Sequence, residues 1–311
     1  MEQKQSLYFT VDQQKKHAVF LNGIQMNRLL YLPLYFISIL PFPFLYFLSD
    51  CAYFLFYYIL QYRKKIVRIN LENSFPLLSL SELKTIEQEF YHHFCDVLFE
   101  AMKALTISKK TILKRFKITN PEMLERFYLE NRSIMLYTAH MGNWEWLSFI
   151  PDYTRFATST FYQPLSNKYI NKLMFHIRSQ FGTHCIPSKH GYKELLRFKN
   201  EGVLSLNCLI GDQSPKHNSQ RHTATFMNQE TDFMVGGDRI ATKLKQAVLY
   251  PEIIKSKRGH YELTFKVIEE RPTHEEKNKC INAYIDLLEQ NIMKQPALWL
   301  WSHRRWKDKH Q

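Results

Sequence analysis

Residues 133–150 read SIMLYTAHMGNWEWLSFI and predict a buried strand that turns sharply into a helix. The first six residues are apolar or favour β structure, and the apolar spacing of the second half suits a helix. Gly142 permits a sharp turn, and Asn143 is a good N-cap. We therefore expect His140 at the end of the strand and Glu145 in the first turn of the helix, an arrangement that places an imidazole beside a carboxylate.

The segments on either side of this turn alternate between helix and strand patterns. A capping box at Ser79 and Glu82 predicts the start of a long helix, and a second at Thr273 and Glu276 predicts the start of the last one. Further strands are predicted at 157–162, 203–210 and 223–227, helices at 167–181, 192–199 and 238–246, and a hairpin at 248–255 with 261–268. Strands separated by helices predict an α/β fold with a mixed, mostly parallel sheet and helices on both of its faces.

A strongly apolar stretch at residues 29–62 precedes this alternation and holds a single charged residue, Asp50. Pro41 and Pro43 divide it into a first piece too short to cross a bilayer and a second piece of about 19 residues, which is long enough. Basic residues follow immediately and favour the anionic cytoplasmic leaflet of a membrane for that end of the stretch. We therefore predict a helical membrane anchor within residues 1–62 and an α/β domain at 63–311. The alternative is a buried helical hairpin of a soluble protein.

The composition indicates an anionic partner and reduced cysteines. The 311-residue chain carries 42 Lys and Arg against 29 Asp and Glu, which gives a formal net charge of +13. Such an excess suits nucleic acid, an acidic protein or a membrane surface, and composition does not choose among them. The five cysteines are widely spaced and form no C-x-x-C pattern, so we expect free thiols and no metal site.

The expected pairing of His140 with Glu145 suits general base catalysis. An unperturbed imidazole titrates near neutral pH, and a neighbouring carboxylate fixes its tautomer and stabilises the protonated ring. The spacing alone is a weak signal, because such a pair occurs about once by chance in a chain of this composition. No nucleophile motif such as G-x-S-x-G accompanies it. The base would then take its proton from a substrate hydroxyl, in a direct transfer without a covalent enzyme intermediate. The alternative is a histidine that only satisfies the turn.

Several sequence blocks follow one another in the order of a known family. The first is A-H-M-G-N-W-E at 139–145, which is similar to an H-x4-[DE] block. The others are Y-Q-P at 162–164 with Arg178 and Gly182, G-D-Q-S-P at 211–215, and the C-terminal block P-A-L-W-L-W-S-H-R-R-W-K at 296–307. Together they resemble the late acyltransferases of lipid A biosynthesis, within the lysophospholipid acyltransferase superfamily. The resemblance runs from about residue 30 to 307 and includes the apolar N-terminal segment.

The resemblance implies roles for the residues of these blocks. His140 would deprotonate an acceptor hydroxyl, Glu145 would orient His140, and Arg178 would hold the reacting thioester oxygen or an acceptor phosphate. Four further residues would contribute to substrate binding: Asn143, Asp212, Gln213 and Arg304. The implied donor is the thioester of an acyl carrier protein, and the implied acceptor is a glycolipid precursor of lipid A. Neither a metal nor an organic cofactor is required.

Other interpretations stay open at this point. Gln163 and Asn228 depart from the family pattern, which leaves an amino-acid lipid or a lysophospholipid as an alternative acceptor. The aromatic and basic C-terminal block suits a membrane interface, a lipid headgroup, packing against the core or nucleic acid. Lipid or structural roles are favoured over nucleic acid, because the sequence contains no recognised nucleic-acid motif. A non-catalytic basic adaptor at the membrane is a further alternative, in which the histidine and carboxylate would have no function.

Overall fold

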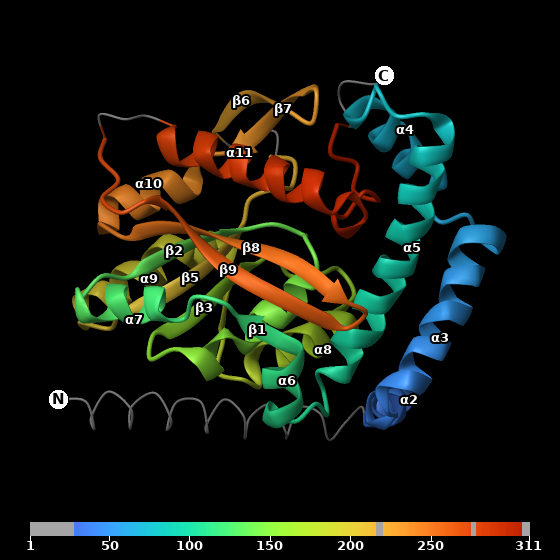
Figure 1. Cartoon of the computed structure of the whole chain (residues 1–311). Coiled ribbons are helices and arrows are strands. Elements are labelled where there is room, and N and C mark those ends of the chain that lie inside the picture. Colours follow the sequence, from blue (N-terminus) through green and yellow to red (C-terminus); the bar gives the residue numbers. More distant parts are fainter. Residues whose placement is uncertain (1–27, 216–219, 275–277, 307–311) are drawn as a thin grey trace.

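A seven-stranded sheet forms the centre of the computed structural model, which describes residues 28–215, 220–274 and 278–306 (Figure 1). Its strands, in the spatial order β1-β9-β8-β2-β5-β3-β4, are β1 (Phe116–Ile118), β9 (His260–Glu269), β8 (Ala247–Lys257), β2 (Ile134–Thr138), β5 (Ser205–Ile210), β3 (Ala157–Tyr162) and β4 (His184–Pro187). Neighbouring strands are parallel except for the antiparallel pair β8 and β9. The predicted mixed, mostly parallel sheet is therefore confirmed.

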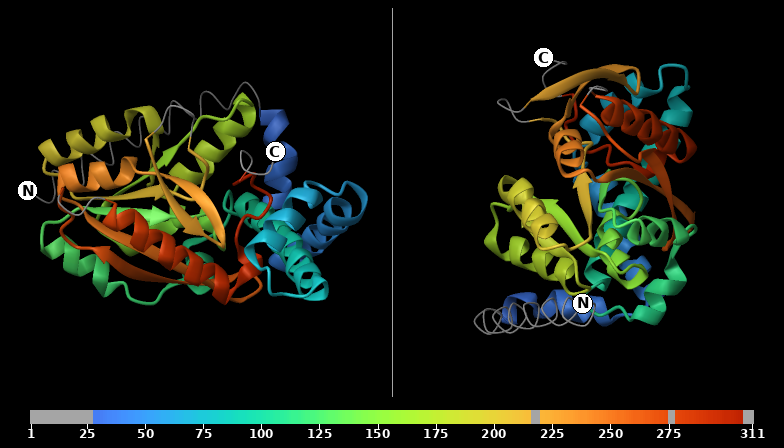
Figure 2. Two further views of the ribbon diagram at one scale, coloured as in Figure 1. Left: turned by 90° about the horizontal axis from the view of Figure 1, so that it is seen from above. Right: turned by 90° about the vertical axis from the view of Figure 1, so that its left-hand side faces the viewer.

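Helices cover both faces of the sheet (Figures 1 and 2), and the alternation of side chains along β2 shows why both faces need cover. Met135 and Tyr137 of β2 join one core cluster, whereas Ile134 and Leu136 join the other. The first core includes residues of α9 (Gly191–Asn200), α10 (Gly236–Leu244) and α11 (Lys279–Lys294). The second includes residues of α6 (Lys109–Arg115), α7 (Glu122–Leu129), η2 (Trp144–Tyr153) and α8 (Lys168–Ser179). A strand buried on both faces is typical of a parallel sheet.

Several predicted elements differ from the observed ones. The capping box at Ser79 does open the long helix α5 (Leu80–Lys103). The predicted start of the last helix at Thr273 is wrong: α11 begins at Lys279, because Asn278 before it has a left-handed backbone. The expected helix after Asn143 is the 3-10 helix η2, with Pro151 inside it. The strands β4 and β7 (Gln229–Met234) were not predicted, and β7 pairs with β6 (Arg221–Phe226) in a separate hairpin.

Some sequence predictions lie outside the described residues. They concern residues 1–27 of the N-terminal segment, Glu276 of the second capping box and Lys307 at the end of the C-terminal block.

Two short 3-10 helices complete the fold. One, η3 (Ser188–His190), links β4 to α9, and the other, η4 (Pro296–Leu298), follows α11.

The apolar N-terminal segment forms two helices, α2 (Arg28–Ile39) and α3 (Phe42–Phe54). Helix α3 continues as the π-helix η1 (Leu55–Ile59). Residues 42–59 form one helix long and apolar enough to cross a membrane. In the structure α3 lies alongside α5, and α4 (Lys64–Ser74) follows it (Figure 1). Leu45, Ser49 and Tyr57 are buried in this packing, whereas other apolar side chains of the segment face outward. The segment therefore has one face on the protein and an exposed apolar face.

A shared cation joins α3 to the rest of the fold. Asp50 pairs with Arg258 in the turn between β8 and β9, at 2.6 Å between Oδ1 and Nη2. The same guanidinium contacts the buried carboxylate of Asp96 on α5 at 2.7 Å. The one charged residue of the apolar segment is thus held by the protein. The contact therefore gives the acid of the apolar segment a cationic partner, while the Asp50 side chain itself stays 47% exposed.

Replacement of Arg258 tests this connection. Arg258→Met leaves the buried Asp96 with fewer partners, and we expect the free energy of unfolding to fall by about 1–3 kcal/mol in urea titration. The matched control is Arg197→Met, which removes a guanidinium whose ion pairs with Glu194 and Glu201 are exposed. Exposed pairs contribute about 0–1 kcal/mol, so the control should lose less. An equal loss in the two variants would contradict the connecting role of Arg258.

Candidate active site

The turn at residues 139–145, which we call the site turn, leaves the carboxyl end of β2 and requires glycine at its centre. Gly142 has φ of +59°, a backbone conformation that L side chains rarely adopt. A Cβ atom at this position would lie 2.5 Å from Cγ2 of Ile253. The N–H of Gly142 donates to the carbonyl of Leu298 at 3.0 Å. The turn is therefore fixed from the sheet side and from the C-terminal segment.

His140 is bound by Asp212, which lies two residues after the end of β5. Nδ1 of His140 lies 2.8 Å from Oδ1 of Asp212, and the backbone N–H of His140 donates to Oδ2 at 2.9 Å. Asp212 is 2% exposed, and Nε1 of Trp299 donates to its Oδ2 at 2.9 Å. Burial alone would raise the pKa of Asp212, but the attraction of His140 and these hydrogen bonds hold it at about 2. Asp212 therefore remains ionised at neutral pH and fixes one ring nitrogen of His140.

The expected contact between Glu145 and His140 is replaced by another pairing. Glu145 accepts two hydrogen bonds from Arg178 of α8, from Nε at 2.9 Å and from Nη2 at 2.7 Å. Nε1 of Trp144 also donates to Glu145, at 3.1 Å. Although burial opposes it, the charge of Arg178 lowers the pKa of Glu145. The prediction that Glu145 orients His140 directly is wrong in this structure, because the Asp212 carboxylate occupies Nδ1.

The remaining predicted site residues differ in whether their side chains can reach a substrate. Asn143 is fully buried: its amide nitrogen donates to Glu100, and its oxygen accepts from the N–H of Trp146. It therefore caps η2 and presents no exposed atom to a substrate. Gln213 lies at the site, with Nε2 3.3 Å from Nε2 of His140. Arg304 is exposed, and its carbonyl lies near the hydroxyl of Ser214, two residues after Asp212.

The C-terminal block packs beneath the site turn. Trp299, Trp301 and Trp306 are buried, and Arg305 is buried with Nη2 2.6 Å from the carbonyl of Asp232. The N–H of Leu300 donates to the carbonyl of His140 at 3.1 Å, which ties the block to the turn. Of the roles proposed for this aromatic and basic block, packing against the core is therefore the one that the structure shows for its tryptophans.

A small cavity of about 40 Å³ lies behind the site. It is lined by Thr138 of β2, Cys208 and Ile210 of β5, and the Glu145–Arg178 pair, among others. This space holds little more than one or two water molecules, so a fatty acyl chain does not fit it without a rearrangement of side chains.

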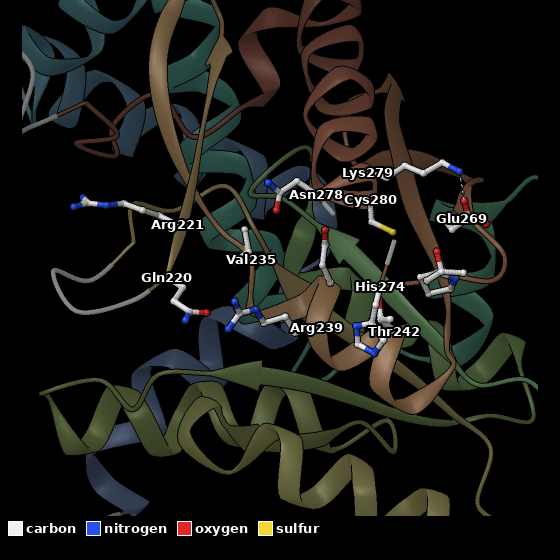
Figure 3. Close-up of a pocket in the computed structure, with 13 residues that line it drawn as sticks. Gln220, Arg221, Val235, Arg239, Thr242, Glu269, His274, Asn278, Lys279 and Cys280 are labelled. Carbon is white, nitrogen blue, oxygen red and sulfur yellow. Dashed lines mark ion pairs between the residues drawn. The ribbon is translucent and has the colours of Figure 1, made fainter. Parts of the chain in front are cut away.

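A larger cavity of about 540 Å³ lies away from His140, between α10 and the start of α11 (Figure 3). Four basic side chains line it: Arg221, Arg239, His274 and Lys279. They do not converge, since Arg221 points away from the others and Lys279 is directed toward Glu269 (Figure 3). Arg221 also pairs with Asp232 at 3.1 Å. We therefore assign no chemistry to this cavity.

Within the described parts of the chain, the cysteines and acidic residues form no metal centre. All five cysteines are free, and no group of three or more His, Cys, Asp or Glu side chains is placed to hold a metal ion. Burial raises the pKa of the Cys208 thiol, which lies near the site, to about 12. A protonated thiol is a poor nucleophile, so this cysteine is not suited to covalent catalysis.

Sequence reasoning identified Asp212 as a site residue but did not connect it to His140. The two residues are far apart in sequence and meet because β2 and β5 are parallel neighbours whose carboxyl ends coincide. The signal was present in part, since G-D-Q-S-P follows a predicted strand just as the site turn does. The order of strands in the sheet was the missing information.

The fold and the site define an α/β protein with a carboxylate-bound histidine at the carboxyl end of its central strand. The family model described as "Bacterial lipid A biosynthesis acyltransferase" matches residues 15–308. The chain belongs to this family and is an acyltransferase. The family predicted from the sequence blocks is therefore confirmed.

Two curated relatives agree with this assignment. The chain is similar to the lipid A biosynthesis palmitoleoyltransferase of Escherichia coli (strain K12), with 22% identity over 269 residues and coverage of 86% of each protein. It is equally similar to the lipid A biosynthesis acyltransferase of Shigella flexneri, with 22% identity and the same coverage.

A glycine substitution tests the geometry of the site turn. Gly142→Ala combines a left-handed backbone with a clash against Ile253, and we expect a loss of about 2–4 kcal/mol in the free energy of unfolding. Gly202→Ala is the matched control, because Gly202 has φ of +67° and no neighbouring atom within 4 Å of the added Cβ. The control should lose only about 1–2 kcal/mol. Equal losses, measured by chemical denaturation, would show that Ile253 does not constrain the turn.

Proposed function

We propose that this protein transfers a fatty acyl group from the thioester of an acyl carrier protein to a hydroxyl of a lipid A precursor, with His140 as the general base. The single observation that carries the proposal is the pairing of Nδ1 of His140 with the buried, ionised Asp212. This pairing leaves Nε2 as the nitrogen that accepts a proton. Asp212 takes the orienting role that the sequence had suggested for Glu145.

The surroundings of Nε2 support a base that acts on a bound hydroxyl. His140 is partly exposed, and among the described residues its Nε2 has a single hydrogen-bond partner, the exposed amide of Gln213 at 3.3 Å. An acceptor hydroxyl can replace this weak contact by a movement of one flexible side chain. The indole of Trp144 lies against the imidazole, with ring centroids 5.2 Å apart, and restricts its rotation.

Arg178 is suited to stabilise negative charge that develops on the thioester oxygen. Glu145 holds its Nε and Nη2, while Nη1 forms no hydrogen bond within the described residues. The side chain is about one quarter exposed, at 27%. A positioned guanidinium in a partly dry site stabilises an oxyanion more effectively than water does. In this proposal Glu145 contributes to catalysis through Arg178.

The proposed reaction balances without a covalent enzyme intermediate. The acceptor hydroxyl gives its proton to Nε2 of His140, and its oxygen attacks the thioester carbonyl. Collapse of the tetrahedral intermediate breaks the carbon–sulfur bond and forms the ester. The protonated His140 then returns the proton to the leaving sulfur, which departs as a free thiol. No nucleophile from the protein and no cofactor are needed for these steps.

The charge of the chain supports both proposed substrates. A formal net charge of +13 attracts an acidic carrier protein and an acceptor with phosphate groups. The curated relatives are named for lipid A biosynthesis, which supports a glycolipid acceptor over an amino-acid lipid or a lysophospholipid.

One of the two departures from the family pattern, Asn228, has a structural explanation. Asn228 takes φ of +61° in the turn between β6 and β7 and donates to the carbonyl of Ser74.

We further propose that the N-terminal helices bind the cytoplasmic face of the inner membrane. Their large exposed side chains form an apolar surface: Leu32, Tyr35, Phe36, Ile39, Phe44, Phe47, Phe54, Leu55, Tyr58, Ile59, Leu60 and Tyr62. The start of α8 adds exposed apolar residues, and the hydroxyl of Tyr31 on α2 donates to the carbonyl of Tyr169 there. Because α8 also carries Arg178, the proposed membrane surface approaches the site along this helix.

The catalytic proposal is tested by thiol release. Purified protein with an acyl carrier thioester and a tetra-acylated lipid A precursor should release free carrier thiol. We expect His140→Ala to lower kcat about 100- to 10,000-fold. Asp212→Asn should cost a similar factor, because it loses the charge that fixes the tautomer. Asp286→Asn, an exposed acid on α11, is the control and should retain full activity. Wild-type rates in His140→Ala would refute the mechanism, and equal rates with a coenzyme A thioester would refute the carrier preference.

The membrane proposal is tested by charge substitution on the exposed apolar surface. Phe36→Glu, Phe47→Glu and Ile59→Glu in one chain should lower binding to vesicles with anionic lipid by at least about tenfold in a sedimentation assay, because each removes apolar area from the interface. The matched control carries Leu77→Glu, Leu129→Glu and Met293→Glu, which are each more than half exposed, as the test residues are, but lie elsewhere. Equal binding by the two triple variants would exclude the proposed surface.

A further inference from the structure

We propose that Glu100 of α5 is a positioning residue for acyl transfer, whose buried carboxylate fixes the Asn143 side chain and thereby the turn that carries His140 and Glu145. Nδ2 of Asn143 donates to Oε2 of Glu100 at 2.6 Å. Asn143 in turn caps η2, which starts one residue before Glu145. The inference rests on the proposed function for its catalytic meaning, whereas the positioning of the turn is a property of the fold.

Glu100 collects donors from three separate parts of the chain. Besides Asn143, the hydroxyl of Tyr261 on β9 donates to Oε2 at 2.8 Å. The hydroxyl of Tyr46 on α3 donates to Oε1 at 2.9 Å. One carboxylate therefore joins the sheet, the apolar N-terminal segment and the site turn. Because both oxygens are occupied, its orientation is fixed, and so is the position at which it holds Asn143.

The environment of Glu100 differs from that of the other buried acids on α5. Glu87 pairs with Arg68 at 2.7 Å, and Asp96 pairs with Arg258 at 2.7 Å. Glu100 is 1% exposed and forms no ion pair with any described residue. Burial raises its pKa to about 7, because an ionised carboxylate is costly in a buried site where its hydrogen-bond donors, Tyr46, Asn143 and Tyr261, are neutral. A buried carboxylate of this kind is costly for stability, which argues for a specific role.

A second contact from α5 supports the same conclusion. Nε2 of His93 lies 3.2 Å from the carbonyl of Gly142, and Nε1 of Trp146 donates to the backbone carbonyl of Glu100 at 3.3 Å. Burial lowers the pKa of His93 to about 3, so the ring is neutral and serves as a hydrogen-bond donor to Gly142. Helix α5 thus contacts the site turn at Gly142 and Asn143, and the following residue Trp146. Of these contacts, the Glu100 side chain takes part only in the one with Asn143, so its replacement leaves the contacts at Gly142 and Trp146 in place.

Paired substitutions at Glu100 separate positioning from stability. Glu100→Met removes the acceptor, and we expect kcat to fall about 10- to 100-fold with KM for the thioester unchanged, since the base is displaced and binding is not. Hydrogen exchange of the amides at 140–146 should become faster in this variant. Glu100→Gln should restore both values to near wild type, because its amide oxygen can accept from Asn143 and Tyr261.

The matched control is Glu87→Met, the same change at a buried acid of the same helix that does not contact the site turn. It should lower stability while kcat and the exchange at 140–146 stay at wild-type values. Exchange and kcat in Glu100→Met that match this control would overturn the proposal. If Glu100→Met does not fold, Glu100→Asp is the alternative. Its side chain is one methylene shorter, which moves the carboxylate away from Asn143, and the hydrogen exchange of the amides at 140–146 should again become faster. Absence of thiol release in the wild type would refute the proposed function alone, and the exchange comparison would still decide the positioning role.

Discussion

The carboxylate of Asp212 is the group on which the site depends. It accepts from the backbone N–H and the imidazole of His140 and from the indole of Trp299. Three distant segments, the end of β2, the end of β5 and the C-terminal block, are therefore joined at one buried charge. Such a charge is tolerated only when hydrogen bonds and an adjacent partner compensate for its desolvation. The three donors provide this compensation and at the same time fix the imidazole.

The long helix α5 connects this site to the N-terminal segment. One part of its surface holds the site turn through His93 and Glu100, and another receives α3 through Tyr46 and through Ser49, whose hydroxyl donates to Asp96 at 2.8 Å. Side chains along a helix point in all directions around its axis, so one straight helix can serve two neighbours at once. The apolar exposed surface and His140 are thereby parts of one packed structure rather than separate modules joined by a linker.

The sequence predicted the elements better than their partners. The capping box at Ser79 located the start of α5, because it is a local interaction between residues three apart. The similar pattern at Thr273 failed, since α11 begins only after the left-handed residue Asn278. The strand β4 was missed because its four residues carry too weak a pattern, and its place at the edge of the sheet depends on pairing with β3. Pairing across the sheet is a long-range choice that local pattern does not contain.

The sequence alone determined that a histidine stands at a strand end and that the chain belongs with acyltransferases of lipid A biosynthesis, and it predicted Asp212 and Arg178 as residues of the site. These conclusions follow from local patterns and from the order of the blocks. Only the tertiary structure decided which carboxylate binds the imidazole. Glu145, five residues from His140, faces Arg178 of α8, whereas Asp212 meets His140 because β2 and β5 lie side by side. A hydrogen bond needs both distance and direction, and both are set by the neighbouring strand and not by spacing along the chain.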